Sequence, residues 1–252
     1  MNKDTRVAVC CYDGDAHQAI HNLGLYLHHE CPLVFLSPAD RPVVVNYPGV
    51  ESRSGGKAAY TGIDSLTRQR RHLEILLEFP ETHFMIHDAD SFCLDAKFPD
   101  YLYAEPDVVW SNQVNDDIPQ HQSTFPKGWP HVAFQPPYFL SRRTIEAMLA
   151  TADQVVPSLN MMPFIDYYMV QLTMVAGLPW QRFQNCISCP ISGDSNKKLS
   201  ARDVATYEMG LRIGIRQVRH EGVNIIHSVK DAKAAQLLVE QRRLYLAEHP
   251  QP

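Results

Sequence analysis

The residues with the clearest chemistry are two aspartates, Asp88 and Asp90, which follow an apolar run at residues 84–86. A short apolar run that ends abruptly in charge is typical of a buried strand reaching the edge of a sheet. In extended backbone the side chains alternate, so both carboxylates would lie on one side, with Ala89 on the other. Such a pair favours a divalent cation with oxygen ligands, which can also bind phosphate. A solvated acidic turn is the alternative for any Asp-x-Asp tripeptide.

Polar residues also follow two other strand-like segments. Tyr12 and Asp13 come after an apolar segment near the start of the chain, and His227 and Lys230 come after a later one. Ligands of open α/β sheets bind beyond the carboxyl ends of the strands, so we expect these ends to share one site. Two carboxylates and an imidazole suit Mn2+ or Mg2+, with the imidazole favouring manganese. A lysine beside the ion would stabilise a departing diphosphate. Taken singly, the same residues are better explained as helix caps, core residues or solvated side chains.

Apolar and amphipathic segments alternate along the first half of the chain, which indicates an α/β fold. We expect strands at 7–11, 33–36, 43–45 and 108–111, one ending at Asp88, and helices at 15–29 and 64–79. In the second half we expect a proline-rich loop at 112–137, strands at 138–140 and 223–226, and helices at 141–152, 164–176, 201–219 and 230–247. Ser141 is a suitable N-cap for the first of these helices. The pattern predicts a single Rossmann-like domain over residues 1–252, with a mostly parallel central sheet flanked by helices.

Composition narrows the class of protein. The chain is 45% hydrophobic and 20% charged, as is ordinary for a globular protein, and its net charge of −5 argues against a surface coated with basic residues for nucleic acid. No apolar stretch approaches the ~20 residues of a membrane helix, and the N-terminus lacks a signal-peptide layout. We therefore expect a cytoplasmic protein, in the host cytoplasm if the source is viral. Cys186 and Cys189 form a lone Cys-x-x-Cys without a second ligand pair, which favours structural thiols.

The order of these motifs resembles the nucleotide-sugar glycosyltransferases with the A-type fold. In that family a first strand ends at the nucleobase, and an Arg-bearing helix precedes a strand that ends in Asp-x-Asp. An acceptor loop, a helix with an acidic residue and a C-terminal His-x-x-Lys follow. The corresponding segments here are Tyr12-Asp-Gly-Asp15, Arg68 to Arg71, Asp88-Ala-Asp90, Phe164-Ile-Asp166 and His227-Ser-Val-Lys230.

The resemblance, which spans residues 5 to 231, implies a role for each matching residue. Asp88, Asp90 and His227 would hold Mn2+ or Mg2+, and Lys230 would contact the diphosphate of a UDP-sugar. Tyr12 and Asp13 would face the nucleobase or ribose, and Arg71 or Arg68 the ribose or donor sugar. Lys57 follows two glycines whose N–H groups could meet phosphate, although the segment departs from the P-loop pattern. Residues 1–111 would bind the nucleotide-sugar, 112–231 would bind the acceptor and supply the metal-binding histidine, and 232–252 would form a terminal helix.

Asp166 and the acceptor leave alternatives open. Asp166 would be either a general base toward the acceptor hydroxyl or a carboxylate that stabilises a helix N-terminus. Residues 112–137 would grip a saccharide or a hydroxymethylated pyrimidine in DNA. This segment carries, in or beside it, the aromatic and histidine residues Trp110, His121, Phe125, Trp129, His131 and Phe134. A base in duplex DNA would have to be flipped out to react. The competing hypotheses are a nucleotidyltransferase, which normally needs a Gly-rich loop after the first strand, and a non-catalytic nucleotide-sugar-binding module.

Overall fold

The protein was studied as a computed structural model. It describes residues 4–11, 16–59, 63–116, 132–155, 165–184, 186–191, 201–219, 224–229 and 231–249. The statements below concern these ranges.

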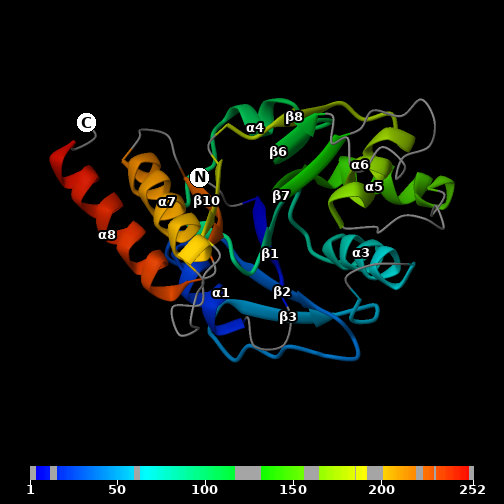
Figure 1. Cartoon of the computed structure of the whole chain (residues 1–252). Helices are drawn as coiled ribbons and strands as arrows, with labels where there is room; N and C mark the ends of the chain where they lie inside the picture. Colours follow the sequence, from blue (N-terminus) through cyan, green and yellow to red (C-terminus); the bar gives the residue numbers. More distant parts are fainter. Residues whose placement is uncertain are drawn as a thin grey trace.

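A seven-stranded sheet forms the centre of the molecule (Figure 1). Its strands are β1 (Thr5–Cys10), β2 (Leu33–Ser37), β3 (Val50–Ser54), β4 (His83–Asp88), β6 (Val109–Asp116), β7 (Val132–Ser141) and β8 (Trp180–Arg182). They lie in the order β3-β2-β1-β4-β7-β6-β8. Only β7 runs antiparallel to its two neighbours, and the other pairings in this sheet are parallel. The predicted α/β fold with a mostly parallel sheet is therefore confirmed.

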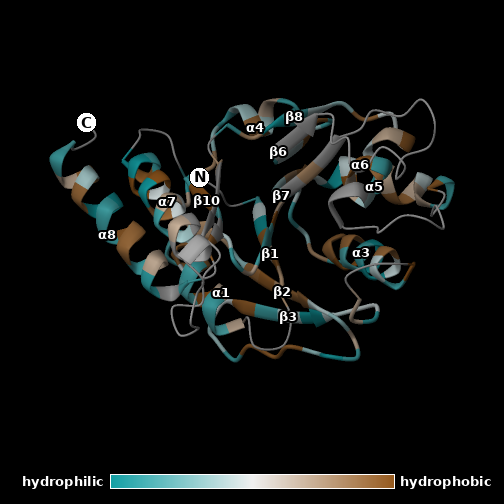
Figure 2. Ribbon diagram, viewed as in Figure 1, coloured by the Kyte–Doolittle hydropathy of each residue, from teal (hydrophilic) through white to brown (hydrophobic). Residues whose placement is uncertain are grey.

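Helices cover both faces of this sheet. The helices are α1 (Ala16–Leu23), α2 (Leu25–His28), α3 (Ile63–Leu76), α4 (Tyr101–Ala104), α5 (Arg142–Thr151), α6 (Ile165–Val175), α7 (Ala201–Val218) and α8 (Ala232–Glu248), with a short 3-10 turn at Ala152–Gln154. Ala8 packs in one core with α3, α5 and α6, whereas its neighbours Val7 and Val9 pack in another with α1 and α2. Because both faces are buried, the middle residues of β1, β2 and β4 are continuously apolar, without polar alternation. Figure 2 shows that α3 carries both hydrophobic and hydrophilic residues, as a helix with one buried face should.

A second, three-stranded sheet lies beside the first. It contains β5 (Phe92–Cys93), β10 (Ile225–Val229) and β9 (Cys186–Ile191), in the order β5-β10-β9. Residues of α7 and α8 pack with this sheet in a third core. Figure 1 shows α7 and α8 at the opposite end of the molecule from α3, α5 and α6. Because β5 follows β4 after a short turn, the second sheet meets the first at the end of β4.

Several boundaries differ from those that the sequence predicts. The strand expected at 43–45 is wrong, since the third strand is β3, whose charged residues hide its strand character. The helix expected at 15–29 divides at Gly24. β6 and β7 extend into the predicted loop, and β8 and β9 were not expected. Ser141 caps α5 as predicted, accepting a hydrogen bond from the Thr144 N–H. A helix able to span a bilayer is not found among the described residues.

Candidate metal centre

Asp88 and Asp90 lie where β4 leaves the central sheet. Asp88 is the last residue of β4 and pairs with Cys10 of the parallel strand β1. The Ala89 N–H then donates to the Cys10 carbonyl at 3.2 Å, and the Ser91 N–H donates to the Asp88 carbonyl at 3.1 Å. The backbone therefore turns at Asp90, instead of staying extended as predicted. The turn leads directly into β5, which belongs to the second sheet.

His227 reaches the same place from the C-terminal part of the chain. In the antiparallel pairing of β5 with β10, Ile226 lies opposite Phe92. The next residues on each strand are His227 and Ser91, and the His227 Nδ1 lies 3.2 Å from the Ser91 Oγ. The same nitrogen lies 3.6 Å from the Asp90 Oδ1. The second sheet thus carries an imidazole to the carboxyl end of β4.

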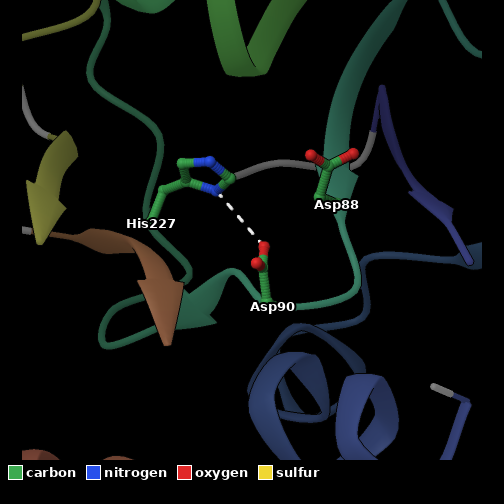
Figure 3. A group of neighbouring side chains, drawn as sticks. All are labelled: Asp88, Asp90 and His227. Carbon is green, nitrogen blue, oxygen red and sulfur yellow. Dashed lines mark ion pairs between the residues drawn. The ribbon is translucent and has the colours of Figure 1, made fainter. Parts of the chain in front are cut away.

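The three side chains form a compact group of potential metal ligands (Figure 3). One ligand atom from each of Asp88, Asp90 and His227 lies within 4.8 Å of the others. Two ligand atoms bound to one ion at about 2.1 Å are at most about 4.2 Å apart, so modest side-chain adjustment closes the group around a cation. The His227 side chain is 11% exposed and that of Asp90 19%, so a bound ion would keep access to solvent or substrate on one side. The donor set of two carboxylate oxygens and one imidazole fits a divalent cation.

A second histidine, His87, lies behind the cluster and is held neutral. It precedes Asp88 on β4, so its side chain leaves the opposite face of the strand. Burial, and to a lesser degree the nearby His227, lower the pKa of His87 to about 3. Its Nε2 lies 3.1 Å from the Tyr26 hydroxyl, and the two rings are in contact. His87 therefore supports β4 from the core and adds no positive charge to the site at neutral pH.

A cavity opens at the carboxyl ends of β1 and β2, next to Asp88. It is a small hollow, partly open to solvent, and is lined by Cys10, Cys11, Leu36, Pro38, Arg68, Gln69 and His72. Burial, and then the negative charge of Asp88, raise the pKa of the Cys10 thiol, whereas Arg68 lowers it. Cys10 thus lies between the cavity and the carboxylates, and its protonated thiol is not a nucleophile. The cavity combines apolar walls with the positive charge of Arg68.

The predicted arginine helix presents Arg68 to the cavity instead of Arg71. Arg71 lies on the exposed face of α3, where it pairs with Glu74 at 3.1 Å and Glu78 at 3.3 Å. Arg68, one turn earlier, is buried and lines the cavity. Gly56 makes this possible, because a Cβ at that position would lie 2.4 Å from the Arg68 Cα. The loop before α3 can therefore pass directly over the helix.

The remaining predicted site residues are divided between an exposed loop and segments outside the described ranges. Lys57 is exposed, and the adjacent Gly55 N–H donates to the Ser37 carbonyl at 3.0 Å, so that donor is already used inside the protein. Tyr12, Asp13 and Lys230 lie outside the described residues. Asp166 falls in the first turn of α6, but its side chain is outside the described set.

Two further expectations concern cysteines and aromatic residues. Cys186 is buried, in agreement with a structural role, and the Cys189 side chain is outside the described set. Trp110 and Phe134 are core residues, packed against Tyr101 and Trp180 respectively. These two residues therefore form no exposed stacking surface for an acceptor, contrary to expectation. The other residues of that prediction, His121, Phe125, Trp129 and His131, lie outside the described ranges.

Comparisons with known proteins give no family for this chain. No protein-family model matches it, and no curated protein matches it in sequence. One solved structure with a similar arrangement is 4-diphosphocytidyl-2C-methyl-D-erythritol synthase from Anaerococcus prevotii. It is 11% identical, the alignment covers 84% of this chain and 100% of that one, and the TM-score is 0.40. A likeness of this degree assigns no activity, so the glycosyltransferase resemblance rests on the order of the motifs and stays a prediction.

Proposed function

We propose that Asp88, Asp90 and His227 hold a divalent cation, Mn2+ or Mg2+, and that the protein is a metal-dependent glycosyltransferase. It would move a sugar from a UDP-sugar to a hydroxyl acceptor. The observation that carries the proposal is the meeting of two carboxylates and an imidazole, from distant parts of the chain, at the carboxyl end of β4. The carboxyl ends of parallel strands are where open α/β sheets bind their ligands. The assignment to glycosyl transfer is based on the order of the motifs, which resembles that of the A-type glycosyltransferases.

Different residues around the cluster would bind different parts of the donor. When bound, the cation would neutralise the charge that develops on the UDP diphosphate as the sugar leaves. Asp88 and Asp90 bind the cation through oxygen, and His227 tilts the preference toward manganese. Arg68 offers a buried positive charge in the adjacent cavity, which suits the phosphate or ribose of the donor better than the glutamate-paired Arg71.

The remaining roles follow from the family resemblance. Lys230 would contact the diphosphate, and Tyr12 and Asp13 the nucleobase. Asp166 would accept the proton of the acceptor hydroxyl as it attacks the sugar carbon. The alternative for Asp166 is stabilisation of the N-terminus of α6, worth about 0.3–1 kcal/mol. The acceptor is a saccharide or a hydroxymethylated pyrimidine in DNA, bound by the 112–231 part of the chain.

One experiment separates this function from its alternatives. The protein is incubated with Mn2+ and a panel of nucleotide-sugars, with and without candidate acceptors, and free nucleotide is measured. We expect UDP release that requires Mn2+ and is lost in Asp90→Ala. Asp107→Ala is the matched control, because Asp107 is an exposed aspartate just before β6, at the opposite edge of the sheet. That variant should keep wild-type activity.

The other outcomes identify other functions. Release of pyrophosphate from a nucleoside triphosphate, with no turnover of any UDP-sugar, would replace glycosyl transfer by nucleotidyl transfer, which also uses metal-bound carboxylates on an α/β sheet. Metal-dependent UDP binding without turnover of any donor would make the protein a binding module. Asp166→Asn separates the two roles of that residue: a base is required for transfer but not for donor binding, whereas a helix cap is required for neither.

A further inference from the structure

We propose that Gln18, a residue of α1, is a positioning residue for the metal cluster. Its side-chain amide fixes the Val229 peptide group, and through it the separation of His227 from Asp90. The inference rests on the proposed metal site and adds to it a part that no motif contains. The Gln18 side chain donates to the Val229 carbonyl, so its effect on the cluster passes through the backbone of β10.

Both polar groups of the Val229 backbone are used to hold β10 at the cluster. The Val229 N–H donates to the Asp90 carbonyl at 2.6 Å. The Val229 carbonyl accepts from the Gln18 Nε2 at 2.8 Å. Val229 is therefore bound to the Asp-x-Asp turn through its N–H and to α1 through its carbonyl, two residues beyond His227.

The sheet itself does not hold this part of β10 in a regular register. The pairing of β10 with β5 ends at Ile226 and Phe92. On the other side, the register with β9 shifts between His227 and Val229. An irregularity of this kind re-aims the side chains beside it and leaves the local ladder incomplete. Val229 still pairs with Ile191 of β9, but its own N–H and carbonyl bond to Asp90 and Gln18, so these two hydrogen bonds hold β10 right beside the irregularity that follows His227.

Helix α1, which carries Gln18, is anchored in the hydrophobic core. Ala19, the next residue, and Leu23 are completely buried in the core on that face of the central sheet. The Gln18 side chain itself is partly exposed, so it can be changed without opening a cavity in the core. Because α1 begins shortly after β1, Gln18 connects the end of the first strand to the end of the last one. The carboxylates of Asp88 and Asp90 are set by the end of β4 and the turn that follows it, and Gln18 sets the histidine against them.

The test measures Mn2+ affinity without any nucleotide, in wild type and in Gln18→Met. Methionine keeps the length of the side chain and removes the hydrogen-bond donor. We expect about a tenfold weaker Mn2+ affinity, as is typical when a residue that orients a ligand is lost. The nitrogen coupling of the His227 imidazole in the electron-spin-echo spectrum of bound Mn2+ should also decrease. Gln18→Lys, which again offers a donor to the Val229 carbonyl, should restore most of both signals.

Controls separate positioning from a general effect on folding. His21→Ala changes an exposed residue one turn further along α1 and should leave the affinity and the spectrum unchanged. Melting temperatures without metal should match across the set. If Gln18→Met is unfolded, Gln18→Ser, whose side chain is too short to reach the carbonyl, takes its place in the comparison.

The results distinguish the two proposals. Wild-type affinity and an unchanged nitrogen coupling in Gln18→Met, together with loss of Mn2+ in Asp90→Asn, would overturn the role of Gln18 and leave the metal site standing. A wild-type protein that binds no Mn2+ would overturn both. Weakened binding that Gln18→Lys does not restore would also overturn the role, because the donor would then not be the property that matters.

Discussion

His227 is the side chain that joins the C-terminal part of the chain to the carboxylates. It is buried, and its Nδ1 lies 3.2 Å from the Ser91 Oγ and 3.6 Å from the Asp90 Oδ1. We expect His227→Ala to fold and to bind UDP in the presence of Mn2+ at least about tenfold more weakly, since losing even an outer partner of a metal ligand often costs that much. Calorimetric titration with UDP, with and without Mn2+, measures the effect. His249→Ala, at an exposed histidine, is the control. An unchanged manganese dependence in His227→Ala would remove the residue from the site.

His72, which lines the cavity, should make the stability of the protein depend on pH. Burial, and then the nearby Arg68, lower its pKa from 6.5 to about 4. Between these two pH values the unfolded chain binds more protons than the folded protein, so stability decreases as the pH falls from 6.5 toward 4. The change is about 1.4 kcal/mol per pH unit while the difference of one proton persists, or about 3 kcal/mol in all.

Urea unfolding at pH 7 and pH 5 measures this dependence. The wild type should lose more stability between the two pH values than His72→Gln, in which position 72 no longer titrates. The variant keeps the similar contribution of the buried His87, so its slope is reduced without reaching zero. Equal slopes would show that His72 takes up its proton as readily in the folded protein as in the unfolded chain.

At the residue scale, the sequence predicts which residues belong to the site better than it predicts which side chain of a helix faces that site. Asp88, Asp90 and His227 could be grouped because each follows a strand, and strand ends meet at one edge of a sheet. The choice between Arg68 and Arg71 could not be made in the same way. Residues three apart on a helix differ by only about 60° around its axis, so packing decides which one is buried. The loop carrying Gly56 covers the Arg68 side of α3, and that contact has no signature in the local pattern.

At the scale of elements, Arg142 fixes the end of α3 to the start of α5. Its guanidinium donates to the carbonyls of Leu77, Phe79 and Glu81, which follow the last turn of α3. Such carbonyls lack partners within the helix, and a charged donor is a strong one for them. We expect Arg142→Ala to lower the free energy of unfolding by about 2 kcal/mol.

The neighbouring arginine provides the comparison. Arg143 is exposed and pairs with Asp107 at the surface. Arg143→Ala should therefore change stability by less than about 0.5 kcal/mol. Urea denaturation of both variants gives the two values under the same conditions. Equal effects would mean that the carbonyls are satisfied by water when the guanidinium is absent.

The elements that the sequence missed share a physical property. β8 has three residues, and β9 contains a proline and a cysteine pair, so neither shows an alternation long enough to recognise. β3 shows no apolar alternation, because Val50 is its only apolar residue and none of its five residues is fully buried. In contrast, α3 has a long amphipathic pattern and β4 a fully apolar centre, and both were predicted close to their observed bounds. Elements stabilised mainly by distant partners are those that local patterns do not reveal.

At the scale of the whole molecule, two sheets meet at the metal cluster. Asp88 belongs to the seven-stranded sheet, His227 to the three-stranded one, and Asp90 to the turn between them. The predicted fold class described the larger sheet only. The smaller one combines a two-residue strand with strands that are far apart in the sequence, and its existence depends on contacts that only the folded chain makes.

Because the two sheets join at Asp90, a cation bound by the cluster would link one sheet to the other. If Mn2+ binds Asp88 and His227 together, any opening movement of β10 away from the turn must first break a metal–ligand bond. Hydrogen–deuterium exchange should then slow at the Val229 amide, which bonds to the Asp90 carbonyl, when Mn2+ is added. Amides in β2, which is fixed within the larger sheet, should exchange at the same rate with or without the ion. Equal protection of Val229 in both conditions would show that the two sheets stay together without the metal.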